Sequence, residues 1–332
     1  MTAKSLLALL ATSALVSGCA TAPQGPAPTA VPEGAIEGAI EGAMECGQLA
    51  IQLAYDDQAR LLRVTTPAAQ YLMKPVAAGS GARFEAIGDA TTGFWSKGEE
   101  GVLTIRDQAM PTCMLPGAVA LPFVAHGQEP FWAVTLDAGQ LTLEQPGESP
   151  VVLGYRELAR SATGRDYRAA QSGQVVTLAV ARQLCRDTMS GLAYPVQARV
   201  AINGELLGEG CGGDPTRLLR GVEWVVEDIA GEGIIDSSRV TLEFLADGRL
   251  AGRASCNRYF GSWQQTGEGL ALAPLGATRM ACASALMNQE DRFLRQLAAV
   301  DRFDIGPHGE LLLLSADRGI IRAVQSTGMP AD

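Results

Sequence analysis

The chain has 332 residues, 47% of them hydrophobic, and its formal net charge is −10 at pH 7. This length and apolar content suffice for two or three domains with modest cores. The acidic balance and the lack of a basic cluster argue against a nucleic-acid partner, whereas an acidic surface favours encounter with a basic protein. With 38 glycines and 17 prolines, the composition predicts many turns and short strands, and hence a mainly β protein.

The first 18 residues have the features of a bacterial export signal. Lys4 precedes an apolar run at 5–16 that is too short to span a bilayer as a finished helix. The run ends in Leu15-Val16-Ser17-Gly18-Cys19, which resembles the lipobox, where the cysteine is acylated and becomes the mature N-terminus. The alternatives are an ordinary signal peptide with an incidental cysteine, or a buried apolar strand. We expect a signal peptide at 1–18 and a lipid on Cys19, which would anchor the protein to the membrane.

Residues 19–43 have the composition of a tether. They are rich in Ala, Pro and Gly and end in the repeat EGAI-EGAI-EGAM, which is too short for a solenoid. Such a segment stays extended and flexible. Ala20 rather than Asp follows the cysteine, and resemblance to enterobacterial sorting signals then implies the outer membrane, facing the periplasm.

The cysteines predict disulfides rather than a metal site. Six remain beside Cys19, and none forms a CxxC motif. Because only two histidines are present, a zinc site is not expected, and nothing in the sequence indicates a cofactor. The periplasm is oxidising, so paired cysteines there usually form disulfides, each worth about 3–4 kcal/mol on loop-entropy grounds. Of fifteen possible connectivities, the sequential one places one bridge in each proposed domain: Cys46–Cys113, Cys185–Cys211 and Cys256–Cys282.

The first folded block, residues 44–115, reads as short strands. Apolar runs at 48–53, 59–64 and 101–105 predict strands, and glycine-containing segments at 79–81 and 88–89 predict turns. We expect a small antiparallel sheet closed into a barrel.

Two motifs in this block carry a resemblance. The runs Ala78-Gly79-Ser80-Gly81-Ala82-Arg83-Phe84 and Phe94-Trp95-Ser96-Lys97-Gly98-Glu99-Glu100 are similar to the membrane-bound inhibitors of c-type lysozyme (MliC). That family also bridges an N-terminal cysteine to a C-terminal one, matched by Cys46 and Cys113. The resemblance implies an eight-stranded barrel that inserts its serine loop into the lysozyme cleft.

The resemblance also implies roles for single residues. Ser80 would contact the catalytic carboxylates and Lys97 the acidic residues of the cleft, while Gly79 and Gly81 would give the loop its flexibility. A hydroxyl can both donate to and accept from a pair of carboxylates, one protonated and one ionised. Arg83 is a further candidate contact.

The block departs from the family pattern in three places. Ala78 and Phe84 stand where the family has Ser and Tyr, and the Ser80-to-Lys97 spacing is about three residues longer, through 86–93. The added residues either displace Lys97 or only lengthen a hairpin. Without the resemblance, residues 79–81 would be an ordinary flexible turn. Trp95 would be core or a wall under the Lys97 stem, and Arg83 a solvated residue or part of a structural ion pair.

Residues 116–215 form a second, β-rich block with strands expected at 141–143 and 175–180. Its Glu129-Pro130-Phe131-Trp132 start and the segment from Cys185 to Gly191 resemble an uncharacterised bacterial envelope domain. That resemblance implies no activity. Near a disulfide, residues such as Glu129, Asp187 and Ser190 more often cap turns than catalyse, so we expect structural roles for them.

Residues 217–325 form a third block of α+β type. The sequence predicts strands at 240–244 and 311–314, a hairpin turn at 246–249 and an amphipathic helix at 288–300. Gly252, the segment 256–261 and the segment from Thr278 to Cys282 resemble the META domain of the heat-shock HslJ group. That group is linked to envelope stress and drug tolerance. We expect Asn257 and Tyr259 to support the turn beside the third bridge.

These observations favour an envelope lipoprotein that binds and inhibits c-type lysozyme, and not an enzyme. The alternative is a non-inhibitory envelope-stress scaffold that acts through its META-type domain. A serine hydrolase ranks third. Ser80 lacks the Gly-x-Ser-x-Gly context because residues 78 and 82 are alanines, and His126 or His308 would have to reach a serine from another block.

Overall fold

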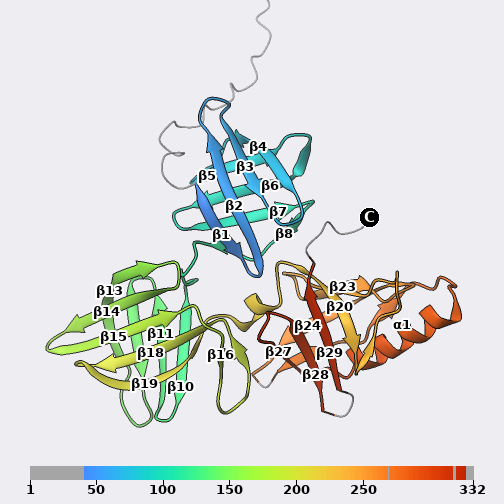
Figure 1. The fold of residues 1–332 in the computed structure, drawn as a ribbon. Coiled ribbons are helices and arrows are strands. Elements are labelled where there is room, and N and C mark those ends of the chain that lie inside the picture. Colours follow the sequence, from blue (N-terminus) through green and yellow to red (C-terminus); the bar gives the residue numbers. More distant parts are fainter. Residues whose placement is uncertain (1–40, 268, 317–318, 327–332) are drawn as a thin grey trace, which may run out of the picture. The chain divides into compact units, whose positions relative to one another are not determined.

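The computed structural model describes residues 41–267, 269–316 and 319–326, and these fold mainly as antiparallel β-sheet (Figure 1). The predicted signal peptide, Cys19 and all but the last residues of the predicted tether lie outside the described residues. No helix in the described ranges is long and apolar enough to cross a membrane.

The first sheet closes on itself and is called the first barrel, residues 42–114. Its strands follow the order β6-β5-β4-β3-β2-β1-β9-β7, a further pairing of β6 with β7 completes the ring, and β8 pairs with β7. Alternate residues point inward, so Phe84 and Phe94 are fully buried in the core. The strands are β1 (Gly42–Cys46), β2 (Leu49–Asp56), β3 (Leu61–Thr65), β4 (Gln70–Val76), β5 (Ala82–Ala86), β6 (Asp89–Lys97), β7 (Glu100–Ile105), β8 (Gln108–Ala109) and β9 (Cys113–Met114).

A second closed barrel, the middle barrel, spans residues 123–212. Its strands follow the order β10-β11-β12-β13-β14-β15-β18-β19, with β19 pairing back to β10, and β16 and β17 form a separate hairpin. Trp132 is fully buried in its core. The strands are β10 (Phe123–Gln128), β11 (Phe131–Asp137), β12 (Gln140–Glu144), β13 (Val151–Ser161), β14 (Gly164–Gln171), β15 (Gln174–Ala181), β16 (Cys185–Arg186), β17 (Ala193–Tyr194), β18 (Val196–Ile202) and β19 (Glu205–Gly212).

A short 3-10 helix, η2 (Pro215–Leu218), precedes a ten-stranded sheet, the C-terminal sheet. Its main path is β25-β24-β23-β22-β20-β29-β28-β27, with β21 beside β20 and β26 beside β24. The strands are β20 (Glu223–Ile229), β21 (Glu232–Gly233), β22 (Thr241–Phe244), β23 (Arg249–Arg253), β24 (Arg258–Gln265), β25 (Leu270–Leu272), β26 (Gly276–Ala277), β27 (Arg302–Ile305), β28 (Leu311–Ser315) and β29 (Gly319–Gln325).

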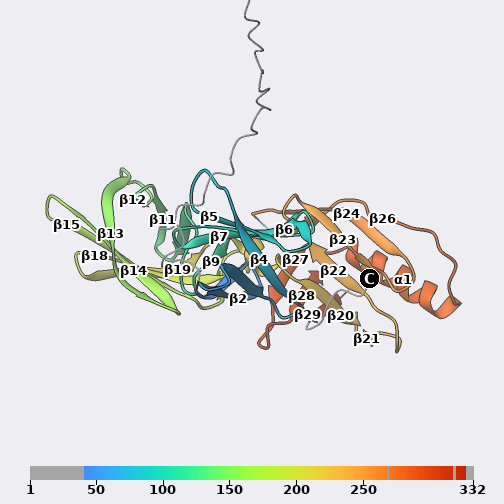
Figure 2. The same ribbon diagram turned by 90° about the horizontal axis from the view of Figure 1, so that it is seen from above.

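One α-helix, α1 (Ser284–Leu297), accompanies this sheet (Figure 2). Phe293 and Leu297 bury one face of the helix in the C-terminal core, as the apolar spacing predicts. The helix begins and ends earlier than the predicted range 288–300. Its end is displaced because the amides of Ala299 and Val300 bond three residues back, which tightens the last turn.

The structure contains the three disulfides that sequential pairing predicts: Cys46–Cys113, Cys185–Cys211 and Cys256–Cys282. The first joins directly opposed residues of β1 and β9, and both of its cysteines are fully buried. It therefore fixes the closure of the first barrel from inside.

Candidate functional site

The predicted serine loop connects β4 to β5. Ser80 is exposed, and its hydroxyl has no hydrogen-bond partner among the described residues. The loop is held instead by its main chain, because the indole Nε1 of Trp95 donates to the Ser80 carbonyl oxygen at 2.8 Å. This arrangement fixes the loop while leaving the hydroxyl free to bind.

The two loop glycines differ in what they do. Gly81 has φ +66°, and a Cβ there would lie 2.2 Å from the carbonyl oxygen of Ser96. A Cβ at Gly79 would meet nothing within 4 Å. Only Gly81 therefore needs to be glycine on conformational grounds.

Lys97 ends β6 close to the serine loop. In the β5–β6 register Ala82 opposes Ser96, so Ser80 and Lys97 lie at the same end of this hairpin. Lys97 is exposed and forms no ion pair with a described residue. A free hydroxyl and a free ammonium thus share one edge of the barrel.

The extra residues between the two motifs do not displace Lys97. They lie at the opposite end of the hairpin, where the register jumps from Glu85–Gly93 to Ala86–Asp89. The Asp89 carboxylate orders this bulge by accepting hydrogen bonds from the hydroxyls of Thr91 and Thr92, each at 2.6 Å, and these bonds lower the pKa of Asp89. The longer spacing is therefore absorbed away from the candidate site.

Arg83 and Trp95 lie opposite each other on the outer face of β5 and β6. With the serine loop and the bulge they border a groove of about 600 Å³. Arg83 Nη2 lies 3.9 Å from Glu85 Oε1, which fits the structural ion pair considered for it. Trp95 is not core. Strand alternation, with Phe94 inward, could have indicated its outward position.

A second polar cluster surrounds Asp187 in the middle barrel. Its Oδ1 accepts from the Ser190 amide and hydroxyl, each at 2.7 Å, and its Oδ2 accepts from Gln128 and lies 3.4 Å from His126 Nε2. The carboxylate thus lies between the serine and the histidine, whereas a nucleophilic triad needs the histidine between the other two. Asp187 and Ser190 cap a turn, as predicted.

Asn257 and Tyr259 also have the predicted structural roles. Asn257 Oδ1 accepts from Thr278 Oγ1 and from the Met280 amide, and its Nδ2 donates to the buried Glu290. The Tyr259 hydroxyl donates to the carbonyl oxygen of Thr241 at 2.9 Å. These bonds tie the segment beside the third disulfide to β22 and α1.

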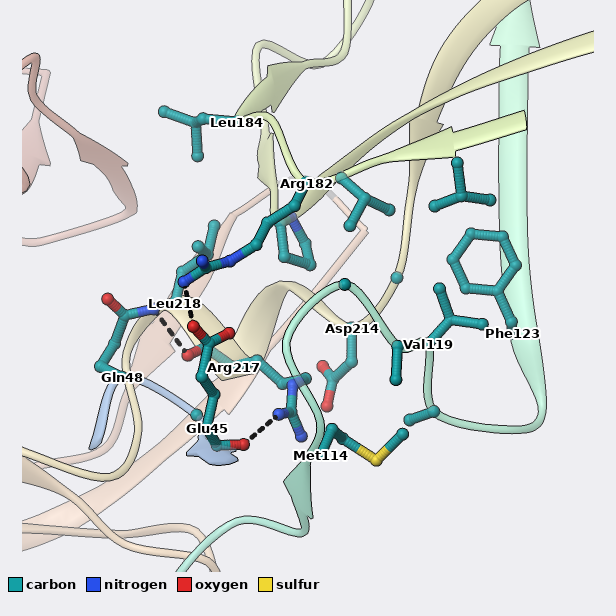
Figure 3. A pocket seen from close by; sticks show the side chains of 18 of the residues that line it. Glu45, Gln48, Met114, Val119, Phe123, Arg182, Leu184, Asp214, Arg217 and Leu218 are labelled. Carbon is teal, nitrogen blue, oxygen red and sulfur yellow. Dashed lines mark hydrogen bonds and ion pairs between the residues drawn. The ribbon is translucent and has the colours of Figure 1, made fainter. Parts of the chain in front are cut away.

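A pocket of about 520 Å³ lies where the first barrel, the middle barrel and η2 meet (Figure 3). Arg217 donates to the carbonyl oxygens of Thr112 and Glu45, and Gln48 donates back to the Arg217 carbonyl oxygen. Arg182 pairs with the Glu45 carboxylate (Figure 3). Each of these charged groups has a partner within the chain. The pocket therefore lies at an interface that these contacts hold together.

Within the described residues, no group of three or more His, Cys, Asp or Glu side chains could hold a metal ion.

Comparison with known proteins identifies two domains. Residues 45–111 match the family of membrane-bound lysozyme-inhibitors of c-type lysozyme, and residues 217–327 match the META domain. The interval between them is compatible with the uncharacterised middle domain. No curated protein matches the chain. An NMR structure of a protein from Burkholderia xenovorans is 26% identical over 34% of this chain and 86% of its own, with a TM-score of 0.29.

Proposed function

We propose that the first barrel inhibits c-type lysozyme by inserting the Ser80 loop, with Lys97 beside it, into the lysozyme cleft. The observation that carries the proposal is the match of residues 45–111 to an inhibitor family, in a barrel whose Ser80 hydroxyl and Lys97 ammonium are both exposed and unpaired within the described chain. The protein would then act as a binding protein and protect peptidoglycan.

The chemistry of the two groups suits a lysozyme cleft. Lysozyme cleaves with one protonated and one ionised carboxyl group. The Ser80 hydroxyl can donate to one and accept from the other, and the Lys97 ammonium can form a charge-assisted hydrogen bond to an acidic cleft residue. The hydrogen bond from Trp95 to the Ser80 carbonyl oxygen restrains the loop and so lowers the ordering cost of binding. Arg83 supplies a second cation on the same face.

The membrane-bound character of the matched family favours an envelope location. We propose that a lipid on Cys19 anchors the protein there, in the outer membrane and facing the periplasm. Cys19→Ser should give a soluble or an uncleaved form of the protein that lacks the mass of the acyl chains. An unchanged fraction and mass would contradict the anchor while leaving the inhibitor proposal intact.

The inhibitor proposal is tested with the oxidised chain from residue 20 to 332. Lysis of a cell-wall suspension by a c-type lysozyme is followed with the parent, with Ser80→Ala, with Lys97→Ala and with the double variant. Truncating one partner of a desolvated charged contact typically costs about 2–5 kcal/mol, so inhibition should fall strongly without unfolding. Lys74→Ala is the matched control, because Lys74 is exposed on β4 of the same barrel.

Two other outcomes would redirect the assignment. If the parent inhibits and the variants inhibit equally well, the contact residues are wrong although the inhibitor assignment stands. If the folded parent does not inhibit at high molar excess, the first barrel is not an inhibitor. The match of residues 217–327 to the META domain would then favour an envelope-stress scaffold.

A further inference from the structure

The turn that carries Lys97 also contacts the middle barrel. Glu99 lies two residues after Lys97, in the β6–β7 turn that Gly98 (φ +63°) allows. Its Oε1 accepts a hydrogen bond from Arg160, and its Oε2 lies 4.0 Å from Arg165 Nη2. Both arginines belong to the β13–β14 hairpin of the middle barrel (Figure 1). The motif's acidic residue therefore faces another part of this chain.

The two arginines form a cluster of like charge, although Arg165 also donates to the carbonyl oxygens of Ser161 and Gly164. Arg160 and Arg165 are directly opposed in the β13–β14 register, and like charges in that position destabilise a hairpin. Glu157 supplies one carboxylate, 2.7 Å from Arg160 Nε and 3.6 Å from Arg165 Nε. The Arg165 side chain is only 4% exposed, so water can do little to solvate its charge. Glu99 supplies a second carboxylate, so that two negative charges face the two positive charges of the arginines.

Two further features hold the hairpin in this place. A β-bulge between Glu157 and Ala159 shifts the register just before Arg160, and bulges re-aim the side chains that follow them. The chain leaving the first barrel also packs on the hairpin, since a Cβ at Gly117 would lie 2.2 Å from the Ser161 carbonyl oxygen. The segment that follows the first barrel therefore packs against the same hairpin that Glu99 contacts.

We propose that Glu99 is a positioning residue through which the middle barrel holds the Lys97 turn in its lysozyme-binding conformation. This inference rests on the proposed function. The Lys97 side chain has no partner of its own among the described residues, so the turn alone determines where its ammonium is presented. A turn that is held before binding loses less conformational entropy when lysozyme docks. The middle barrel thereby acquires a role in inhibition without contacting the catalytic carboxylates.

The test is a double-mutant cycle on lysozyme affinity with the chain from residue 20 to 332. Glu99→Gln and Arg160→Gln should each weaken binding by about three- to fivefold, and the double variant should be no weaker than either single one. Arg199→Gln is the control, because it breaks a comparable exposed pair with Glu209 within the middle barrel. It should leave the affinity unchanged.

Each other outcome overturns the proposal. Equal losses from Glu99→Gln in both Arg160 backgrounds would mean that Glu99 contacts lysozyme itself. Tighter binding by the variants would mean that the middle barrel obstructs the site, and no change beyond the control would mean that the contact has no effect.

A second readout does not depend on lysozyme. In the free protein, Arg160→Gln should speed hydrogen exchange of peptide 94–101, and Arg199→Gln should not. If the parent fails to bind lysozyme but this exchange effect is present, the proposed function fails while the contact stands. If the exchange is unchanged, the positioning role fails whatever lysozyme does.

Discussion

Trp95 and Ser80 are joined by a hydrogen bond from the indole nitrogen to the main-chain carbonyl oxygen, at 2.8 Å. The bond spans from β6 to the loop before β5, the two elements that carry the proposed lysozyme contacts. It restrains the loop through the backbone and leaves the serine hydroxyl unused. The indole therefore supports the loop, and its replacement should change the position of Ser80.

Trp95→Phe tests this support. Phenylalanine keeps an aromatic ring on the outer face of the barrel but cannot donate to the Ser80 carbonyl oxygen. A neutral hydrogen bond of this kind contributes about 1 kcal/mol, so lysozyme affinity should fall about fivefold. Titration calorimetry gives the affinity, and the thermal midpoint checks the fold. An unchanged affinity in a folded variant would show that the loop does not need the indole.

Gly81→Ala and Gly79→Ala form a matched pair within one loop. Alanine at 81 would adopt a left-handed conformation that costs roughly 1–2 kcal/mol, and its Cβ would lie 2.2 Å from the Ser96 carbonyl oxygen. Alanine at 79 enters open space, so stability should change by no more than about 0.5 kcal/mol. Hydrogen exchange of β5 and β6 should therefore rise for Gly81→Ala alone. Similar exchange in both variants would contradict the loop conformation.

Much of the fold could be predicted from the sequence because its signals are local. Apolar runs indicated several of the strands, among them β2, β7 and β15, whereas the strand predicted at 59–64 begins only at Leu61. The even number of cysteines left after Cys19 allowed a sequential pairing that the structure contains. The predicted range of α1, 288–300, was wrong at both ends. At the C-terminal end the reason is the tightened turn at Ala299 and Val300, which depends on backbone geometry that apolar spacing does not encode.

The supports of the candidate site were harder to find. Glu99 and Arg160 are 61 residues apart in the chain, and no local pattern links them. Strand alternation could have indicated that Trp95 points outward. It could not have indicated the partner of Trp95, because that partner is a main-chain oxygen that any residue at position 80 would provide. Sequence motifs indicated Ser80 and Lys97 as the proposed lysozyme contacts, whereas the groups that hold their loop and turn, Trp95 and Glu99, were found only from the coordinates.

Asp187 should make the stability of the middle barrel depend on pH in the acid range. Burial alone would raise the pKa of its carboxyl group. Hydrogen bonds from Ser190, Gln128 and Met189 outweigh that effect and lower the pKa to about 2. A folded-state pKa below the unfolded value, near 3.9, stabilises the protein above about pH 4. This contribution, about 2 kcal/mol, should be lost as the pH falls from about 4 to 2.

Asp187→Asn separates this effect from general acid unfolding. The variant should be less stable at pH 7 by about 2 kcal/mol, and its stability should depend less on pH between about 4 and 2. Asp166→Asn is the control, because Asp166 is exposed on β14 of the same barrel. Thermal unfolding across this pH range, with hydrogen exchange of residues 185–194, gives the comparison. If the stability of Asp187→Asn depends on pH as strongly as that of the parent, another carboxylate causes the acid dependence. The turn at Asp187 is then not the first part of the barrel to unfold in acid.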